Sequence, residues 1–207
     1  MLRSKLPLPA PTLILISVSV WFARYWWVLP LFPLGFILLV KLIRMSKAGQ
    51  YATDKMKLWI PLIGGILEKS IVARTMRTLG TLVASGVPIL EALAIVRETS
   101  NNLVFERMYQ RVYESIREGE TIAEPIRQAR LVDDMVVNMI EVGEETGDLD
   151  AMLYKVADFY DEEVDTAVKS LISTLEPLMV VFLGLIIGYI VISLFLPLVS
   201  LIEGLSK

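Results

Sequence analysis

Carboxylates crowd one stretch of the chain. Residues 131–165 contain twelve acidic side chains and one base, Lys155, whereas residues 49–130 contain nine acids and eleven bases. Such a block can bind a basic protein surface or a divalent cation. Its spacing does not match an EF-hand loop, so the pattern favours a docking surface over a metal site. The acidic residues are Asp133, Asp134, Glu141, Glu144, Glu145, Asp148, Asp150, Asp158, Asp161, Glu162, Glu163 and Asp165.

The string GEETGDL at positions 143–149 lies at the centre of this block. Gly147 suits the left-handed conformation that ends a helix, and Asp148 suits the cap of the next helix. Glu144 and Glu145 then fall in the last turn of the first helix, where the helix dipole disfavours carboxylates. Residues that conflict with their local structure are candidates for function. We therefore expect Glu144, Glu145 and Asp148 to dock a basic partner.

The composition excludes several kinds of active site. The chain has no histidine and no cysteine, which removes the commonest general base, disulfides and thiolate metal ligands. It contains no G-x-x-x-x-G-K-[ST] string and is therefore not itself a P-loop ATPase. The sequence predicts a protein that is not an enzyme, with no catalytic, metal-binding or cofactor-binding residues.

An apolar segment near the C-terminal end must position the acidic block at a membrane. The chain is 55% hydrophobic with a mean hydropathy of +0.59, yet 21% of its residues are charged, so its polar and apolar parts should segregate. Residues 178–198 carry no charge and, as a helix, would be roughly 31 Å long, which matches a bilayer core. We expect a transmembrane helix over 171–200.

Two features of this span are candidates for function. Gly184 and Gly188 form a G-x-x-x-G motif, which lets membrane helices approach closely, so we expect them to pack against another helix. Glu176 and Pro177 lie at the expected cytoplasmic edge, and a carboxylate so close to lipid is usually paired or functional.

The N-terminal apolar region is too long for one span and is interrupted by Arg24, Pro30 and Pro33. We expect residues 1–24 to be a periplasmic or interfacial segment with an apolar surface helix, and residues 25–45 to be a transmembrane helix. A signal peptide is the less favoured alternative, because no small-x-small cleavage site follows Ala23.

Basic residues cluster after this first span and predict the orientation. By the positive-inside tendency, residues 46–170 are expected to be cytoplasmic, whereas both ends, including the tail at 201–207, face outward. The clustered bases are Lys41, Arg44, Lys47, Lys55 and Lys57.

The central segment is expected to be helical throughout, because its apolar residues recur at intervals of three and four. Gly86 and Gly119 should end helices, Asn102 should cap one, and the T-x-x-E string at 121–124 fits a capping box. The predicted fold is all-α: a six-helix antiparallel cytoplasmic bundle between two transmembrane helices. Its helices are expected at 66–84, 88–99 and 103–118, from Thr121, from Asp133 or Asp134, and from Asp148 onward into the second span.

Four strings occur in a familiar order and spacing: LGTLVASGVPILEAL (79–93), IREGETIAEPI (116–126), MIEVGEETGDLDAML (139–153) and LEPLMVVFLGLIIGYIVISLFLPL (175–198). With them the sequence resembles the inner-membrane platform proteins of type II secretion systems and type IV pili, the general secretion pathway protein F family. Members usually carry two copies of the cytoplasmic domain and three spans, and this chain corresponds to the second half. A truncated product, a split subunit and a fragment of a two-copy protein all fit that correspondence.

The resemblance implies a non-enzymatic scaffold that couples a hexameric cytoplasmic ATPase to pilin or pseudopilin extraction from the bilayer. Expected partners are that ATPase, other inner-membrane assembly subunits, pilins, membrane lipid and further copies of the chain, but not nucleic acid. No cofactor is implied. The matching family motif positions are Gly86, Pro88, Glu91, Gly119, Gly143, Glu144, Gly147, Leu149, Glu176, Pro177 and Pro197.

Other platforms and other functions remain as alternatives. A tight-adherence or archaellum-type platform is less consistent with the S-G-V-P-x-L-E-A-L string. A transporter subunit would need more polar residues in its spans, and only Tyr189 and Ser193 interrupt the second one. The sequence leaves open the secretion or pilus system, the exported product and the number of copies.

Overall fold

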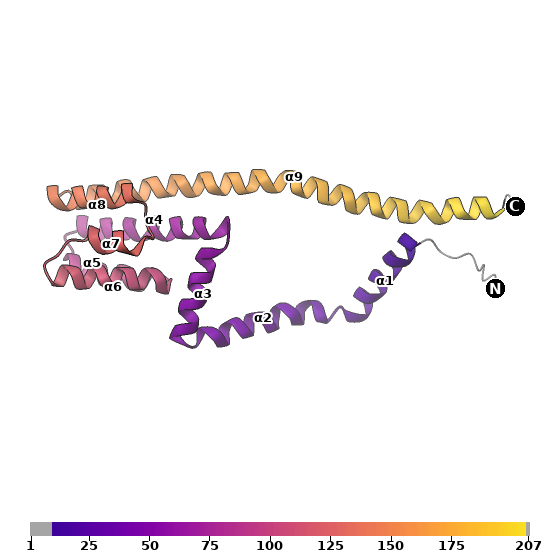
Figure 1. The fold of residues 1–207 in the computed structure, drawn as a ribbon, viewed down its shortest axis with the longest axis horizontal. Coiled ribbons are helices and arrows are strands. Elements are labelled where there is room, and N and C mark those ends of the chain that lie inside the picture. The colour runs from indigo at the N-terminus through magenta and orange to yellow at the C-terminus, as the bar shows by residue number, and fades with distance from the viewer. Residues whose placement is uncertain (1–9, 206–207) are drawn as a thin grey trace. The chain divides into compact units, whose positions relative to one another are not determined.

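The structure is a computed structural model that describes residues 10–205, and every regular element in that range is an α-helix, which confirms the all-α prediction (Figure 1). Residues 1–9 of the expected N-terminal segment and residues 206–207 of the expected tail lie outside the described range. The helices are α1 (Ala10–Tyr25), α2 (Val28–Arg44), α3 (Lys47–Trp59), α4 (Ile63–Ala84), α5 (Ile89–Thr99), α6 (Leu103–Arg117), α7 (Ala123–Ala129), α8 (Asp134–Thr146) and α9 (Leu149–Leu205).

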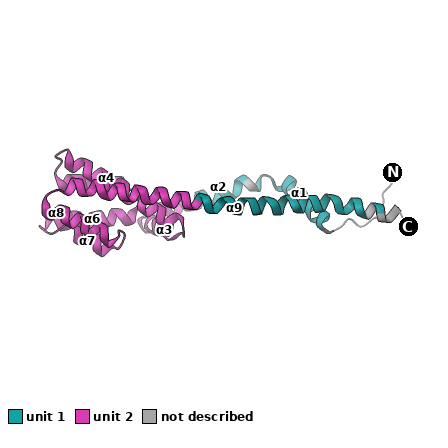
Figure 2. Cartoon of the chain, turned by 90° about the horizontal axis from the view of Figure 1, so that it is seen from above, with its two compact units in different colours: residues 1–39, 172–207 teal, residues 40–171 magenta. Residues whose placement is uncertain are grey.

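The chain divides into two units, which Figure 2 distinguishes by colour. Unit 1 is drawn from residues 1–39 and 172–207, and unit 2 comprises residues 40–171. The acidic block, and the cytoplasmic bundle expected from the sequence, fall in unit 2.

Unit 2 has one apolar core because α4, α5, α6, α8 and the first part of α9 each present a stripe of apolar residues to it. Met76, Phe105 and Leu153 are among its fully buried side chains. The hydroxyl of the buried Tyr109 is satisfied, because it donates its proton to Thr75 Oγ1 at 2.6 Å. Burial raises the pKa of Tyr109, so the phenol stays neutral.

The predicted helix ends are confirmed where they rest on local geometry. Gly86, Gly119 and Gly147 all have positive φ, between 77° and 82°, which glycine adopts without a steric penalty. Asn102 caps α6 as expected, since its side-chain oxygen accepts from Val104 N at 2.9 Å.

Two predictions about unit 2 are wrong. The T-x-x-E capping box does not form, because Ile122 and not Thr121 is the N-cap of α7, and Glu124 bonds Arg127 and Gln128 instead. The second error is the number of helices. The six predicted segments correspond to α4–α8 and the start of α9, but α3 was not expected and packs against α4 and α6.

Unit 1 contains α1, most of α2 and the apolar part of α9. Among the described residues α9 is long and apolar enough to cross a membrane, and α1 and α2, bent by 55° at their break, meet the same criterion as a pair. Two hydrogen bonds join α1 to the apolar run: the Tyr189 hydroxyl donates to Pro11 O at 3.0 Å, and the backbone oxygen of Ser193 accepts from Thr12 Oγ1 at 2.8 Å. The Ser193 hydroxyl donates within α9, to Tyr189 O at 2.8 Å. The spans at 25–45 and 171–200 and the surface helix stay predictions.

Candidate functional site

The α8–α9 turn is closed by two glycines with different tasks. Gly147 ends α8 in the left-handed conformation, with a φ of 77°. Gly143 is buried one turn earlier, and a Cβ atom placed on it would lie 2.9 Å from Met152 Cβ, closer than real contacts allow. The start of α9 therefore packs directly on the backbone of α8, and both glycines are required for that approach.

The carboxylate of Glu144 is used inside the bundle. Its two oxygens lie 3.0 and 2.9 Å from the backbone nitrogen of Ile122, which donates to them at the start of α7. A carboxylate is favourable there because the N-terminus of a helix carries unsatisfied N–H groups and positive dipole charge. Glu144 is therefore unfavourable for the dipole of α8, whose last turn contains it, but favourable for the dipole of α7.

The two other predicted docking residues, Glu145 and Asp148, bond no other helix start within the described range. Glu145 and Asp148 are both exposed at the turn. Asp148 begins α9 through its backbone oxygen, which accepts from Met152 N at 3.2 Å, and its carboxylate makes no hydrogen bond within the described range. The side-chain cap expected of Asp148 is therefore absent, and both carboxylates point into solvent.

Cations from neighbouring helices pair with part of the acidic block. Four of its twelve carboxylates form ion pairs with bases of α4 or α7, so the isolated charge of the segment overstates the charge of the folded surface. Pairing through hydrogen bonds to Asp158 and Asp161 also raises the pKa of Arg77. The pairs are Lys69–Glu163 at 2.6 Å, Arg77–Asp158 at 2.9 Å, Arg77–Asp161 and Arg127–Glu141 at 2.7 Å.

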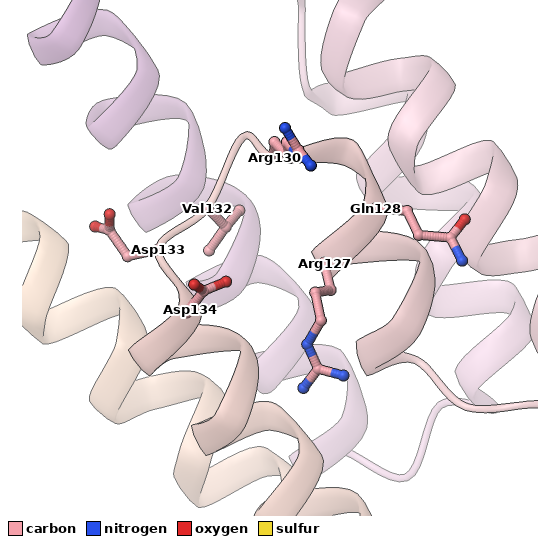
Figure 3. A pocket seen from close by; sticks show the side chains of 6 residues that line it. All are labelled: Arg127, Gln128, Arg130, Val132, Asp133 and Asp134. Carbon is pink, nitrogen blue, oxygen red and sulfur yellow. The ribbon is translucent and has the colours of Figure 1, made fainter.

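A hollow of about 570 Å³ lies between the end of α7 and the start of α8 (Figure 3). Its lining includes Arg127 and Arg130 on one side and Asp133 and Asp134 on the other. Arg130 has a φ of 51°, the left-handed conformation that turns the chain back after α7. Charges of both signs therefore line the hollow.

A smaller hollow of about 170 Å³ adjoins it and is lined by Glu68, Asp133 and Tyr160, among others. The Tyr160 hydroxyl donates to Asp133 Oδ2 at 3.2 Å and accepts from Asp133 N at the same distance. Burial, with the nearby Asp133 charge, raises the pKa of the Glu68 carboxyl, and burial raises the pKa of Tyr160 to about 12. Among the described residues no cluster of three or more acidic side chains has a metal-binding geometry.

The remaining motif positions lie away from the turn. Pro88 is the N-cap of α5, and Glu91 is exposed in its first turn, where the dipole favours an acid. Leu149 is half-buried against the core at the start of α9. Glu176, Pro177 and Pro197 all lie within α9.

The two glycines of the G-x-x-x-G motif have open surroundings. A Cβ atom added to Gly184 or to Gly188 would meet nothing within 4 Å. No described helix of this chain covers them, and their role in packing against another chain stays a prediction.

Sequence analysis missed one polar centre, Asp54 of α3. Its side chain is fully buried, with Oδ1 at 3.0 Å from Lys57 Nζ and 3.4 Å from Arg44 Nη2. The other oxygen accepts from Leu103 N at 3.2 Å, at the first residue of α6. A signal was present, since Asp54 is the one acid among the five bases at positions 41–57.

Comparisons with known proteins show to which family the chain is similar. Residues 75–197 match the family described as type II secretion system (T2SS), protein F. The chain is 46% identical over 153 residues to type IV pilus assembly protein PilC of Myxococcus xanthus, which covers 74% of this chain and 37% of that protein. It is 41% identical over 195 residues to PilC of Thermus thermophilus, covering 94% and 44%.

A secretion protein is similar over the same length. Type II secretion system protein F of Aeromonas hydrophila is 33% identical over 196 residues, covering 94% of this chain and 50% of that protein. The chain thus spans half or less of the length of these three relatives. Because the family match covers more than half of its residues, the chain belongs to the type II secretion system protein F family.

Proposed function

We propose that this chain is a non-catalytic platform subunit of a type II secretion or type IV pilus assembly machine in the bacterial inner membrane. Family membership and the names of the similar proteins support this function. In the proposed topology unit 2 is cytoplasmic, and α2 and α9 enter the bilayer. The partners are a cytoplasmic hexameric ATPase, other assembly subunits, pilins or pseudopilins, and further copies of the chain.

The continuity of α9 carries the mechanistic part of the proposal. This helix begins at Leu149, directly after the acidic turn, and continues as one α-helix through the apolar run at 178–198. A helix is stiff along its axis because each turn is hydrogen-bonded to the next. A force applied by the ATPase at the turn is therefore transmitted to the membrane segment, where pilin subunits leave the bilayer.

The docking surface for the ATPase is the exposed part of the acidic block. Glu145 and Asp148 form its centre, because both are exposed and neither has an ion-pair partner in the described part of the chain. Glu144 contributes indirectly by holding the start of α7 beside the turn. A basic surface on the ATPase complements this charge, and such attraction is screened by salt.

The test is binding of the purified cognate ATPase to the full chain in lipid nanodiscs. Glu145→Lys with Asp148→Lys should weaken binding by about tenfold, since each reversal replaces an attraction by a repulsion of similar size. The wild-type affinity should also fall steeply with salt. Glu144 is left intact, because its reversal would disturb α7 as well as any contact.

The matched control is Glu98→Lys with Glu118→Lys, which makes the same change of net charge at two exposed positions, one in α5 and one directly after α6. This control should bind the ATPase as the wild type does. Equal affinities of the docking variant and the wild type would exclude the turn as the contact. An equal loss in both variants would show that only net charge matters.

A further inference from the structure

Helix α3 buries a charged residue and exposes large apolar ones, unlike an ordinary surface helix. On the face toward the bundle Asp54 is fully buried, and Arg107 of α6 stacks over the Tyr51 ring at 4.0 Å. On the opposite face, at helical spacing, lie Lys55, Met56 and Trp59, all exposed. A buried carboxylate and a large exposed apolar surface are both unusual, and here they occur on one helix.

The exposed apolar surface continues through the turn into α4. Trp59 is 87% exposed, Leu62 73% and Met56 68%. Leu62 has a φ of 71°, a conformation that costs free energy for a bulky residue. The turn is held by Gly64 N, which donates to Ile60 O at 2.7 Å. Helix α3 runs crosswise to α4 at this corner of unit 2 (Figure 1).

The charges around this surface are basic. Residues 40–67 contain five bases and one acid, and that acid, Asp54, is already paired with Arg44 and Lys57 inside the protein. Lys47 and Lys55 are exposed and have no ion-pair partner in the described range. A surface with a tryptophan, a methionine and unpaired lysines is typical of helices that lie in the headgroup region of an anionic bilayer.

We propose that the outer face of α3 and the α3–α4 turn form a lipid-binding surface. Trp59, Met56 and Leu62 enter the boundary between headgroups and acyl chains, and Lys47 and Lys55 contact phosphate groups of anionic phospholipids. The burial of Asp54 serves this arrangement, because its bond to Leu103 N of α6 orients the apolar face outward.

Continuity with the membrane segment favours lipid over a protein partner. Helix α3 begins three residues after the end of α2, whose exposed side chains between Leu31 and Leu39 are apolar. A bilayer that contains α2 is therefore within reach of α3, and its anionic headgroups complement the unpaired lysines. The inference rests on the proposed membrane location but not on the identity of the assembly machine.

The experiment uses the full chain in vesicles with Trp59 as its single tryptophan, after Trp21→Phe, Trp26→Phe and Trp27→Phe. Flotation first checks membrane insertion. Quenching of Trp59 is then measured with phospholipids brominated near the headgroup or near the chain end, and with aqueous acrylamide. The vesicles are phosphatidylcholine with or without about one third phosphatidylglycerol.

In anionic vesicles we expect headgroup-proximal bromine to quench Trp59 at least about twofold more than chain-end bromine, and acrylamide to quench it weakly. The variant Lys47→Gln with Lys55→Gln should lose the added quenching that phosphatidylglycerol provides. The control Arg117→Gln with Lys155→Gln, which removes two exposed charges elsewhere in unit 2, should keep it.

Strong quenching by acrylamide without quenching by bromine would overturn the proposal, because Trp59 would be in water. Protection from both quenchers would also overturn it, because a protein would then cover the surface. A chain that floats with vesicles but gives either result leaves the platform function standing. A chain that does not float contradicts the membrane location and the lipid surface together.

Discussion

The starts of α6 and α7 are held in the same way by different kinds of site. Each helix has its first backbone nitrogens bonded by a carboxylate from a distant helix: Asp54 at Leu103 N, and Glu144 at Ile122 N. Asp54 is fully buried and lies beside two cations, whereas Glu144 is half-buried and pairs with no cation among residues 10–205. In addition α6 has a local cap, Asn102, and α7 has none.

The difference shows what each carboxylate is for. At α6 the local cap already satisfies part of the helix end, so the further contribution of Asp54 is to fix α3 against the bundle. At α7, a seven-residue helix, Glu144 supplies the bond that a capping box would draw from the helix itself. Pro125 occupies the position from which such a box would reach back. Asp54 therefore orients α3, whereas Glu144 allows the short helix α7 to form.

Removing the buried carboxylate of Asp54 should have the largest effect on the free energy of unfolding. Asp54→Ala should lower the free energy of unfolding by about 3 kcal/mol, because it leaves two cations and the Leu103 amide without their acceptor. Thermal unfolding in detergent measures the loss, and amide exchange should accelerate at the start of α6. Asp54→Asn should lose less, since its amide oxygen can still accept from Leu103 N. Equal losses in the two variants would contradict the role of that hydrogen bond.

Removing the cap of α7 should have a smaller and more local effect. Glu144→Ala should cost about 1–2 kcal/mol, as loss of an N-cap does, and should release amide protection in α7 while leaving α6 unchanged. Glu145→Ala, one residue away and exposed, is the matched control and should stay within about 0.5 kcal/mol of the wild type. Hydrogen exchange followed by mass spectrometry resolves the two segments. Unchanged exchange of α7 in Glu144→Ala would remove the distinction between the two sites.

Glu68 sharpens the comparison, since it is a half-buried carboxylate that is not at a helix N-terminus. Its pKa is raised above 4.5 by burial and by Asp133, so the folded state holds the proton more tightly than the unfolded state. Stability should therefore fall slightly as pH rises through the range just above 4.5, and Glu68→Gln should flatten this slope. Unfolding midpoints across that range measure it. A steeper slope in the variant would reverse the assigned sign.

Much of the secondary structure could be predicted because its causes are local. Helical periodicity of apolar residues, glycines at 86, 119 and 147, and the uncharged run at 178–198 each act within a few residues of sequence. Helix α3 was not predicted because it lacks such a local signal. Its inner face carries a buried Asp54 between Tyr51 and Leu58, while Met56 and Trp59 are exposed, so the apolar pattern that predicts helices is weak.

Only the tertiary structure determined which groups the charged side chains bind. The sequence by itself determined an all-helical chain, a membrane-length apolar helix and an acidic block. It did not determine that Glu144 would serve α7, because two local acceptors, Thr121 and Glu124, were equally available to the same helix end. An N–H group bonds whichever acceptor the packing brings within about 3 Å, and that choice depends on residues far apart in sequence. Here the packing of α7 against α8 decides it, because it places Glu144 beside Ile122.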